Sequence, residues 1–196
     1  MIYKGYKDKF KSGSITIYND DCMNILKQTP DNYYQLCIVD PPYGIDAGNM
    51  QMGKGKGTDS RIWINKGWDN KPPPPEYFIE MYRVSKNQII WGANYFDNMK
   101  ATPCWVIWDK IQEFSGASFE MAWTSFKSPS KAFKMARCEA YVGVNKIHPT
   151  QKPVKLYEWL LKNYAKKGDR ILDTHLGSGS SAIAAHYGGF DFVGCE

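Results

Sequence analysis

The stretch Leu36-Cys-Ile-Val-Asp-Pro-Pro-Tyr43 gives the strongest indication of the fold. Its first four residues form a continuous apolar run, which is typical of a parallel strand buried on both faces. The run stops at Asp40, and Pro41 and Pro42 then fix the backbone and remove two N–H donors. A buried strand that ends in an acidic residue predicts a functional site at the C-terminal edge of a parallel sheet.

The same alternation of elements continues on both sides of this stretch. Apolar runs predict further strands, and spacing of three to four residues predicts helices between them. Strands alternating with helices indicate an α/β fold with a mostly parallel sheet covered by helices on both faces. The predicted strands are 14–18, 36–39, 88–91, 105–108, 170–173 and 190–194, and the predicted helices are 22–28, 76–84, 154–165 and 180–187.

Acidic residues stand at four of the predicted strand ends. They are Asp20 with Asp21, Asp40, Asp173 and Glu196. Because parallel strands end at the same edge of a sheet, these carboxylates are expected to gather in one place.

Three segments are less regular. Residues 44–68 are predicted to form a loop, and the four prolines at 72–75 form a stiff segment in which no helix is expected. Residues 111–146 give a weaker pattern, in which the strand-like stretches 119–126 and 140–144 flank a basic piece.

Composition sets broad limits on the class of protein. Of the 196 residues, 43% are hydrophobic and 23% charged, and no apolar run approaches the roughly 20 residues that span a bilayer. Residues 1–11 are polar and Lys-rich without a signal-peptide core, so a cytoplasmic protein is expected. The five cysteines and three histidines lack metal-site spacing, which predicts free, mostly buried thiols and no metal site. The net charge of +5 is compatible with a phosphate-rich partner but does not establish one.

The C-terminal segment has the layout of an adenosine-type cofactor site. A strand ends at Asp173, a Gly177-x-Gly179 turn opens a helix, and the next strand ends at Glu196. Glycines let the backbone approach a ligand, and a distal carboxylate can accept both ribose hydroxyls. The turn is neither a P-loop nor a full dinucleotide pattern, and the alternative is a tight strand–helix turn with Glu196 merely at the chain end.

Residues 40–43 suit one kind of chemistry. A carboxylate and a neighbouring carbonyl can accept both hydrogens of an –NH2 group, and Tyr43 offers a stacking face. An exocyclic base amine is a poor nucleophile, but two acceptors favour a pyramidal nitrogen whose lone pair can attack a sulfonium methyl group. The base must leave the duplex to reach them. The alternative is a rigid turn with a capping Asp40.

These segments together resemble the amino-group DNA methyltransferases of the beta arrangement, in which the catalytic half precedes the cofactor half. The motif at 40–43 is similar to the family's catalytic motif in the form usual for adenine N6 methylation, whereas cytosine N4 enzymes usually carry Ser at the position of Asp40. Residues 148–153 match the segment that leads into the cofactor half, and 19–22 resemble the segment whose acid lies near the cofactor adenine. Residues 173–181 are similar to the cofactor loop, with Thr174-His175 in place of the usual Pro-Phe.

The resemblance implies a Rossmann-like S-adenosylmethionine-dependent methyltransferase fold, circularly permuted, with a mostly parallel seven-stranded sheet. The chain would be a single domain with a catalytic half at about 14–110, a variable target-recognition region at about 111–146 and a cofactor half at about 147–196. The implied catalytic residues are Asp40, Pro41, Pro42 and Tyr43. The implied S-adenosylmethionine-binding residues are Asp21, Thr150, Lys152, Asp173, His175, Gly177, Ser178, Gly179 and Glu196. For Lys152, the alternative interpretation is a surface lysine.

Double-stranded DNA is the partner that this resemblance implies, with no membrane association. The candidate DNA contacts are Lys54, Lys56 and Arg61 on the loop, and Lys127, Lys131, Lys134 and Arg137 in the variable region. A solvated lysine face is the alternative for both groups, and Trp123 and Phe126 are expected in the core.

The expected function is site-specific adenine N6 methylation of DNA. The alternatives are a cytosine N4 methyltransferase, an RNA or protein amine methyltransferase, and a catalytically silent DNA-binding protein of the same fold. The recognition sequence and the choice between monomer and homodimer stay open. Family members usually continue beyond the strand that ends at Glu196, so this carboxylate is expected to lack a downstream anchor.

Overall fold

The computed structural model describes residues 3–47, 67–97, 99–111, 117–143, 147–148 and 150–196. Its strands are β1 (Asp8–Ser12), β2 (Ile15–Asn19), β3 (Tyr34–Val39), β4 (Ser85–Trp91), β5 (Trp105–Asp109), β6 (Phe119–Thr124), β7 (Lys131–Lys134), β8 (Arg170–Asp173) and β9 (Asp191–Cys195). Its helices are α1 (Cys22–Gln28), α2 (Pro75–Val84), α3 (Arg137–Ala140), α4 (Val154–Tyr164) and α5 (Ser180–Gly188), and Ala93–Tyr95 forms the 3₁₀ turn η2.

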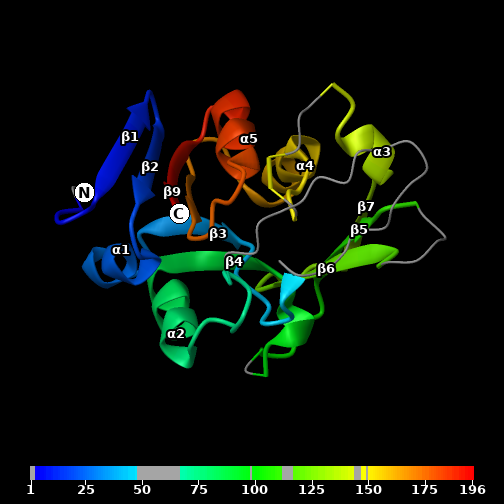
Figure 1. The fold of residues 1–196 in the computed structure, drawn as a ribbon, viewed down its shortest axis with the longest axis horizontal. Coiled ribbons are helices and arrows are strands. Elements are labelled where there is room, and N and C mark those ends of the chain that lie inside the picture. The colour runs from blue at the N-terminus through cyan, green and yellow to red at the C-terminus, as the bar shows by residue number, and fades with distance from the viewer. Residues whose placement is uncertain (1–2, 48–66, 98, 112–116, 144–146, 149) are drawn as a thin grey trace.

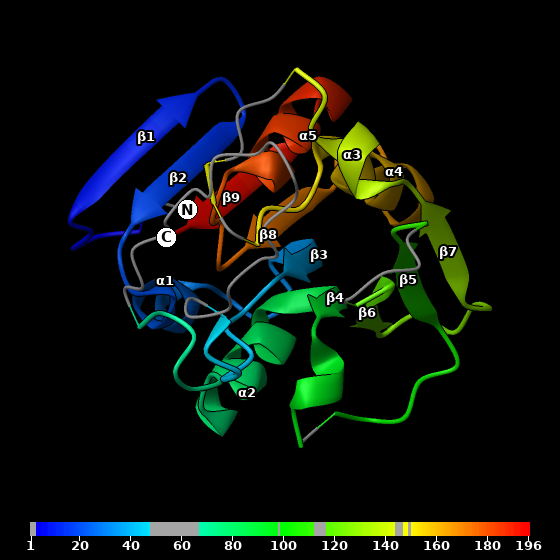
Figure 2. The same ribbon diagram turned by 45° about the vertical axis from the view of Figure 1, so that its right-hand side comes forward.

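The strands form one sheet with the order β1-β2-β9-β8-β3-β4-β6-β5-β7, which can be followed from one side to the other in Figure 2. The central strands β2, β9, β8, β3 and β4 are parallel, and β6 is antiparallel to both of its neighbours. The predicted fold class, a Rossmann-like methyltransferase fold with a mostly parallel sheet, is confirmed. In the described part of the chain the sheet has nine strands where seven were expected, because β1 and β7 are added at its two edges.

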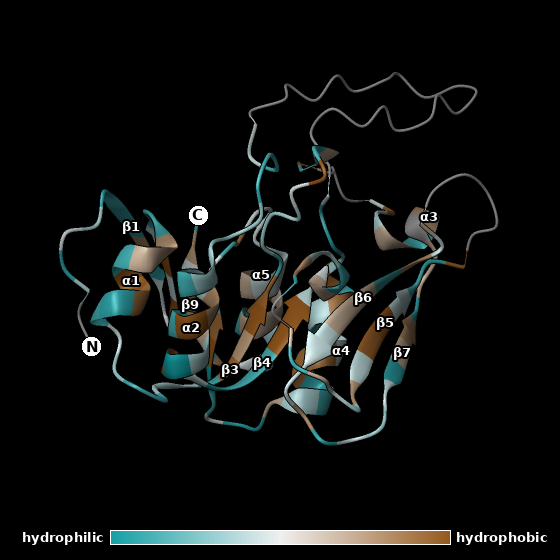
Figure 3. Cartoon of the chain, turned by 90° about the horizontal axis from the view of Figure 1, so that it is seen from below, coloured by the Kyte–Doolittle hydropathy of each residue, from teal (hydrophilic) through white to brown (hydrophobic). Residues whose placement is uncertain are grey.

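Helices cover both faces of the sheet, with α1 and α2 on one side and α4 and α5 on the other (Figure 1). Alternate side chains of β3 point to opposite faces of the sheet and pack into the hydrophobic core on each face. Leu36 and Ile38 belong to the core beneath α4 and α5, whereas Cys37 and Val39 pack with α1 and α2. The continuous apolar run of β3 therefore reflects burial on both faces, and Figure 3 shows the hydrophobic character of β3 and β4.

Helix α2 begins inside the proline segment. Pro74 is the N-cap and Pro75 the first helical residue, so the expectation that the segment 72–75 contains no helix is wrong at Pro75. Proline fits there because the first N–H groups of a helix have no intrahelical partner and its φ angle is already helical.

The edge elements were not predicted. Strand β1 lies in the polar N-terminal segment, and β7 lies in the basic piece of the variable region. Lysines flank the exposed backbone of both, as is common for edge strands. The strand predicted at 140–144 is wrong: α3 ends at Ala140, and Gly143 has a φ of 70°, which an extended strand does not allow. A short apolar run did not distinguish a helix end and turn from a strand.

The cysteines and the core aromatic residues follow the expectations. All five cysteines are free, and Cys37, Cys104 and Cys195 are buried. Trp123 is buried, and Phe126 packs against the core beneath α4 and α5. Within the described ranges, no helix is long and apolar enough to cross a membrane.

Candidate active site

The acids predicted at the strand ends meet at one edge of the sheet. Strands β2, β9, β8 and β3 are parallel neighbours, so their C-terminal ends lie together. A pocket of about 470 Å³ lies at this edge, a volume in the range of small-molecule sites. We call it the acidic pocket; its wall includes Asp20, Asp21, Asp40, His175, Gly177 and Glu196.

The glycine turn is fastened to the end of β9. The Gly177 N–H donates to Glu196 Oε2 over 2.7 Å, and the Leu176 N–H donates to the Cys195 carbonyl over 2.9 Å. Gly179 has a φ of 77° and forms the N-cap of α5. The turn therefore places Gly177 and Ser178 on the pocket wall, whereas Gly179 is not among the wall residues.

Glu196 is anchored from β2. Its N–H donates to the Tyr18 carbonyl over 3.0 Å, and its carbonyl accepts from the Asp20 N–H over 3.1 Å. The neighbouring strand β2, which lies upstream in the sequence, therefore anchors Glu196 through hydrogen bonds on both sides of it.

Asp173 lies beneath the turn and is not among the residues of the pocket wall. Its side chain accepts from the His175 N–H over 3.1 Å and from the Ser181 hydroxyl over 2.6 Å, and the residue is 1% exposed. Burial raises the pKa of its carboxyl to about 7, although these two hydrogen bonds lower it. These contacts favour shaping of the cofactor loop over a direct ligand contact for Asp173.

His175 is a neutral aromatic side chain on the pocket wall. Burial lowers the pKa of its imidazole to about 4, although Asp21 raises it. Its ring packs edge-on against Tyr77, with centroids 5.3 Å apart, and its Nδ1 lies 2.9 Å from the Thr174 hydroxyl. Because the ring is held and neutral near pH 7, it can offer a stacking surface where the family usually has Phe.

A second pocket of about 360 Å³ adjoins the acidic pocket. We call it the aromatic pocket, because Tyr43, Trp68, Tyr95, Trp108 and Tyr141 contribute to its wall. The two pockets share Asp40, Trp68, Thr150, Gln151 and Lys152. A group bound in one pocket can therefore meet a group bound in the other at Asp40.

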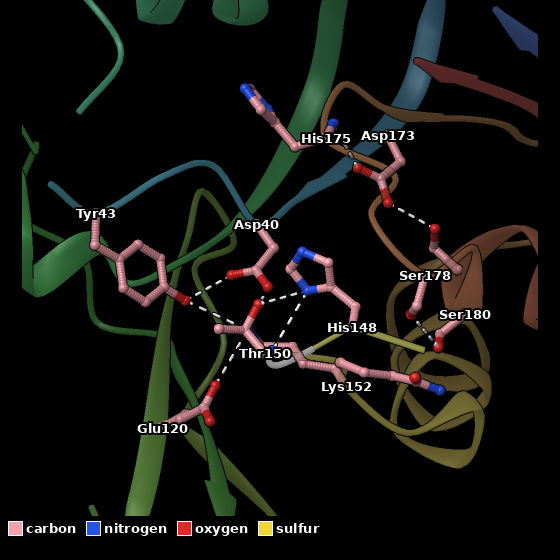
Figure 4. A network of polar contacts seen from close by, with 12 residues as sticks. Asp40, Tyr43, Glu120, His148, Thr150, Lys152, Asp173, His175, Ser178 and Ser180 are labelled. Atoms are coloured by element: carbon pink, nitrogen blue, oxygen red, sulfur yellow. Dashed lines mark hydrogen bonds and ion pairs between the residues drawn. The ribbon is translucent and has the colours of Figure 1, made fainter. Parts of the chain in front are cut away.

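Both carboxylate oxygens of Asp40 are engaged (Figure 4). The Tyr43 hydroxyl donates to Oδ1, and the Lys152 ammonium donates to Oδ2, each over 2.5 Å. Burial and the nearby Asp40 raise the pKa of the Tyr43 phenol well above its usual value, so it stays protonated as a donor. Lys152 is buried, which excludes the alternative that it is a surface lysine.

The ring of Tyr43 lies in a stack. Its centroid is 5.2 Å from that of Tyr95, and the two planes differ by 14°. Gly92, with a φ of 66°, lies directly under this ring, and a Cβ there would come within 2.0 Å of a Tyr43 ring carbon. The ring position therefore requires glycine at 92.

Asp69, which sequence reasoning missed, holds the segment that follows residues 40–42. Its buried carboxylate accepts from the N–H groups of Tyr43 over 2.5 Å, Gly44 over 3.0 Å and Ala47 over 2.8 Å. In the sequence, Asp69 is one polar residue among many in a predicted loop, and no local pattern distinguishes it.

We predict that Asp69→Asn destabilises the fold by roughly 1.5–3 kcal/mol, the usual value of a hydrogen bond to a charged group. An amide has one acceptor oxygen and cannot serve all three donors. Chemical denaturation measures the change, with Asp97→Asn, an exposed position, as the matched control. Equal stability of the two variants would contradict this role of Asp69.

Glu120 and Lys110 are further residues that sequence reasoning missed. Both line the aromatic pocket, and they form an ion pair of 2.7 Å. Glu120 stands in the strand-like stretch Phe119-Glu-Met-Ala-Trp123, so an acid inside an apolar strand was the available signal.

The proposed DNA contacts are spread over the variable region. Lys134 ends β7 at the edge that carries the pockets, whereas Lys127 and Lys131 lie toward the opposite edge, and Lys131 is bonded to Asn163. Of these three lysines, Lys134 is the one that lies at the edge with the pockets. Arg137 begins α3, and its side chain, like Lys54, Lys56 and Arg61, lies outside what the structure describes.

Comparison with known proteins places the chain in a family. The sequence model of the N6/N4 methyltransferase family, described as DNA methylase, matches residues 76–196. The protein YubD of Escherichia coli (strain K12) is 25% identical over 198 residues, covering 90% of this chain and 82% of its own. The type II methyltransferase M2.DpnII of Streptococcus pneumoniae is 29% identical over 137 residues, which cover 69% of this chain and 46% of its own.

A solved structure shares the fold. The PvuII DNA methyltransferase, titled cytosine-N4-specific, superposes with a TM-score of 0.63 at 13% identity, covering 98% of this chain and 86% of its own. Because the family model matches more than half of the chain, the chain belongs to the N6/N4 family of DNA methylases, as its sequence motifs indicated.

Proposed function

We propose that this DNA methylase transfers a methyl group from S-adenosylmethionine to the N6 amine of an adenine flipped out of double-stranded DNA. The observation that carries the proposal is the position of Asp40 where the two pockets meet, with Pro41 and Tyr43 beside it on the wall of the aromatic pocket. The acidic pocket takes the cofactor and the aromatic pocket takes the base.

The residues of the acidic pocket fit S-adenosylmethionine, which supplies an electrophilic methyl group when bound. Glu196 Oε2 holds the glycine turn, and Oε1 can accept hydrogen bonds from ribose hydroxyls. Asp21, whose side chain also caps α1, lies on the wall, and His175 offers an aromatic face. Thr150 and Lys152 lie on the side toward Asp40.

Asp40 acts on the base as a hydrogen-bond acceptor. The hydrogen bond from the Tyr43 hydroxyl to Asp40 Oδ1 breaks, and Oδ1 then accepts one hydrogen of the amine. An adjacent main-chain carbonyl accepts the second amine hydrogen. Two acceptors favour a pyramidal nitrogen and stabilise the positive charge that develops on it as the N–CH3 bond would form and the S–CH3 bond would break. The methylated amine would then lose one proton to solvent. Tyr43 stacks on the flipped base and holds it in line for attack.

We predict that Gly179→Val weakens S-adenosylmethionine binding at least about 10-fold, because a β-branched residue at a φ of 77° costs roughly 1–3 kcal/mol and distorts the turn. Isothermal calorimetry measures the affinity. Gly168→Val is the matched control, since Gly168 has a φ of 89°, open space around it and a position away from the pockets. Unchanged affinity in Gly179→Val would place the cofactor elsewhere.

The choice of adenine rests on Asp40, because the resemblance associates an acid there with N6 methylation and Ser with N4 methylation. The PvuII enzyme is titled cytosine-N4-specific, but a likeness at 13% identity concerns the fold alone. A cytosine N4 methyltransferase therefore remains the second candidate.

Mass spectrometry of nucleosides tests the proposal directly. Unmethylated DNA is incubated with the protein and S-adenosylmethionine carrying a labelled methyl group, and the DNA is digested. Label in N6-methyladenine supports the proposal, and label in N4-methylcytosine keeps the mechanism but corrects the base. Absence of label, with cofactor binding demonstrated by calorimetry, contradicts DNA methylation by this chain.

A further inference from the structure

A network of four charged side chains leads from the catalytic motif into strand β6. Lys152 Nζ lies 2.5 Å from Asp40 Oδ2 and 3.1 Å from Glu120 Oε2, and Figure 4 labels these three residues. Lys110 Nζ lies 2.7 Å from Glu120 Oε1. The four residues come from separate segments, after β3, after β5, in β6 and before α4.

The Lys152 ammonium is held on every side. Its three hydrogens have acceptors in Asp40, Glu120 and the Tyr43 hydroxyl, the last over 3.3 Å. The nitrogen also lies 5.1 Å from the centroid of the Trp91 ring, and the side chain is 2% exposed. These contacts together fix the position of the Lys152 ammonium group.

Both partners stay charged in this position. Burial lowers the pKa of Lys152, but Asp40 and Glu120 outweigh it and hold the pKa above its usual value. Burial raises the pKa of Glu120, but Lys152 and Lys110 outweigh it and lower the pKa to about 2. At neutral pH Lys152 is therefore a cation shared between two carboxylates.

We propose that Lys152 and Glu120 are positioning residues for Asp40. Lys152 holds Oδ2, so that the carboxylate presents Oδ1 to the base amine once the Tyr43 hydroxyl has left it. Glu120 takes a share of the lysine charge and keeps Asp40 a strong hydrogen-bond acceptor. This inference rests on the proposed function, because it assigns Asp40 the role of acceptor.

The charged and titratable groups near Asp40 come from several elements. Tyr43 on its own segment, Lys152 before α4, Tyr157 on α4 and Asp173 at the end of β8 interact with it. Glu120 on β6 and Lys110 after β5 are linked to it through Lys152. Lys152 and Glu120 differ in sign, so removing their charges must affect the Asp40 carboxylate in opposite directions.

The first experiment uses this difference in sign. Single-turnover methylation rates are measured against pH for the unaltered protein, Lys152→Met and Glu120→Gln. Lys152→Met removes a cation beside the reacting centre, so the acidic limb of its profile is expected to move to higher pH. Loss of the anion moves the limb of Glu120→Gln to lower pH.

The exposed residues Lys155 and Glu158 on α4 provide the matched controls Lys155→Met and Glu158→Gln, whose limbs stay in place. If Lys152→Met is inactive, Glu120→Gln decides by itself. An acidic limb that does not move, or that moves to higher pH in Glu120→Gln, overturns the proposal while methylation by the unaltered protein still supports the proposed function.

The second experiment needs no activity. Lys152→Met leaves the Asp40 carboxylate without its cation, whereas Glu120 keeps Lys110 at 2.7 Å, so a lower melting temperature is expected. Adding Asp40→Asn removes the carboxylate that has lost its cation and leaves the Lys110–Glu120 pair intact, so the double variant is expected to melt above Lys152→Met. A double variant that melts at or below Lys152→Met overturns the coupling on which the proposal depends, even if the protein methylates no DNA.

Discussion

Replacement of Asp40 by Ala is expected to lower the rate of methyl transfer by about 10³-fold or more, the scale on which a preorganised hydrogen-bonding group acts on a transition state. The alanine removes the acceptor for the amine. Single-turnover labelling of DNA at saturating cofactor measures the effect.

The fold and the acidic pocket should survive this change. Lys152 keeps Glu120 as a partner at 3.1 Å, so the cation is not left alone in the interior. Calorimetry should show cofactor affinity close to that of the unaltered protein, and Asp97→Ala, an exposed position, serves as the control for activity. Retained turnover in Asp40→Ala would exclude the assigned mechanism.

Replacement of Tyr43 by Ala is expected to lower methyl transfer by about 10- to 100-fold, since stacking of a base on an aromatic ring contributes roughly 1–3 kcal/mol. Tyr43→Phe and Tyr43→Trp keep an aromatic face and should lose less. The same single-turnover assay compares the three variants, and the loss should be recovered in part at higher DNA concentration.

The hydroxyl of Tyr43, rather than its ring, is the alternative explanation for a loss of activity in these three variants. It donates to Asp40 Oδ1, and in the proposed mechanism it leaves this oxygen when the base enters. If the hydroxyl were the essential group, all three variants would lose activity equally. The stacking role is supported only when Tyr43→Ala is clearly the weakest of the three.

Much of the fold could be predicted from the sequence, because the signals are local. The run before Asp40 has an apolar side chain at every position, and this pattern is typical of a strand that is covered on both faces. Strand β3 is covered in this way. The failures are also local in origin. The stretch 140–144 is too short to separate a helix end from a strand, and β1 and β7 are polar because they lie at the edges of the sheet.

The sequence by itself determined the sheet, the acids at its edge, the glycine turn and the motif at 40–43, because each depends on neighbours within a few residues. The tertiary structure alone decided that Asp69 fastens the catalytic segment and that Lys152 and Glu120 meet Asp40. Lys152 and Asp40 are 112 positions apart, and no periodicity or spacing encodes such a contact. It arises only when packing of the sheet and α4 brings the two segments together and leaves each buried charge with a partner.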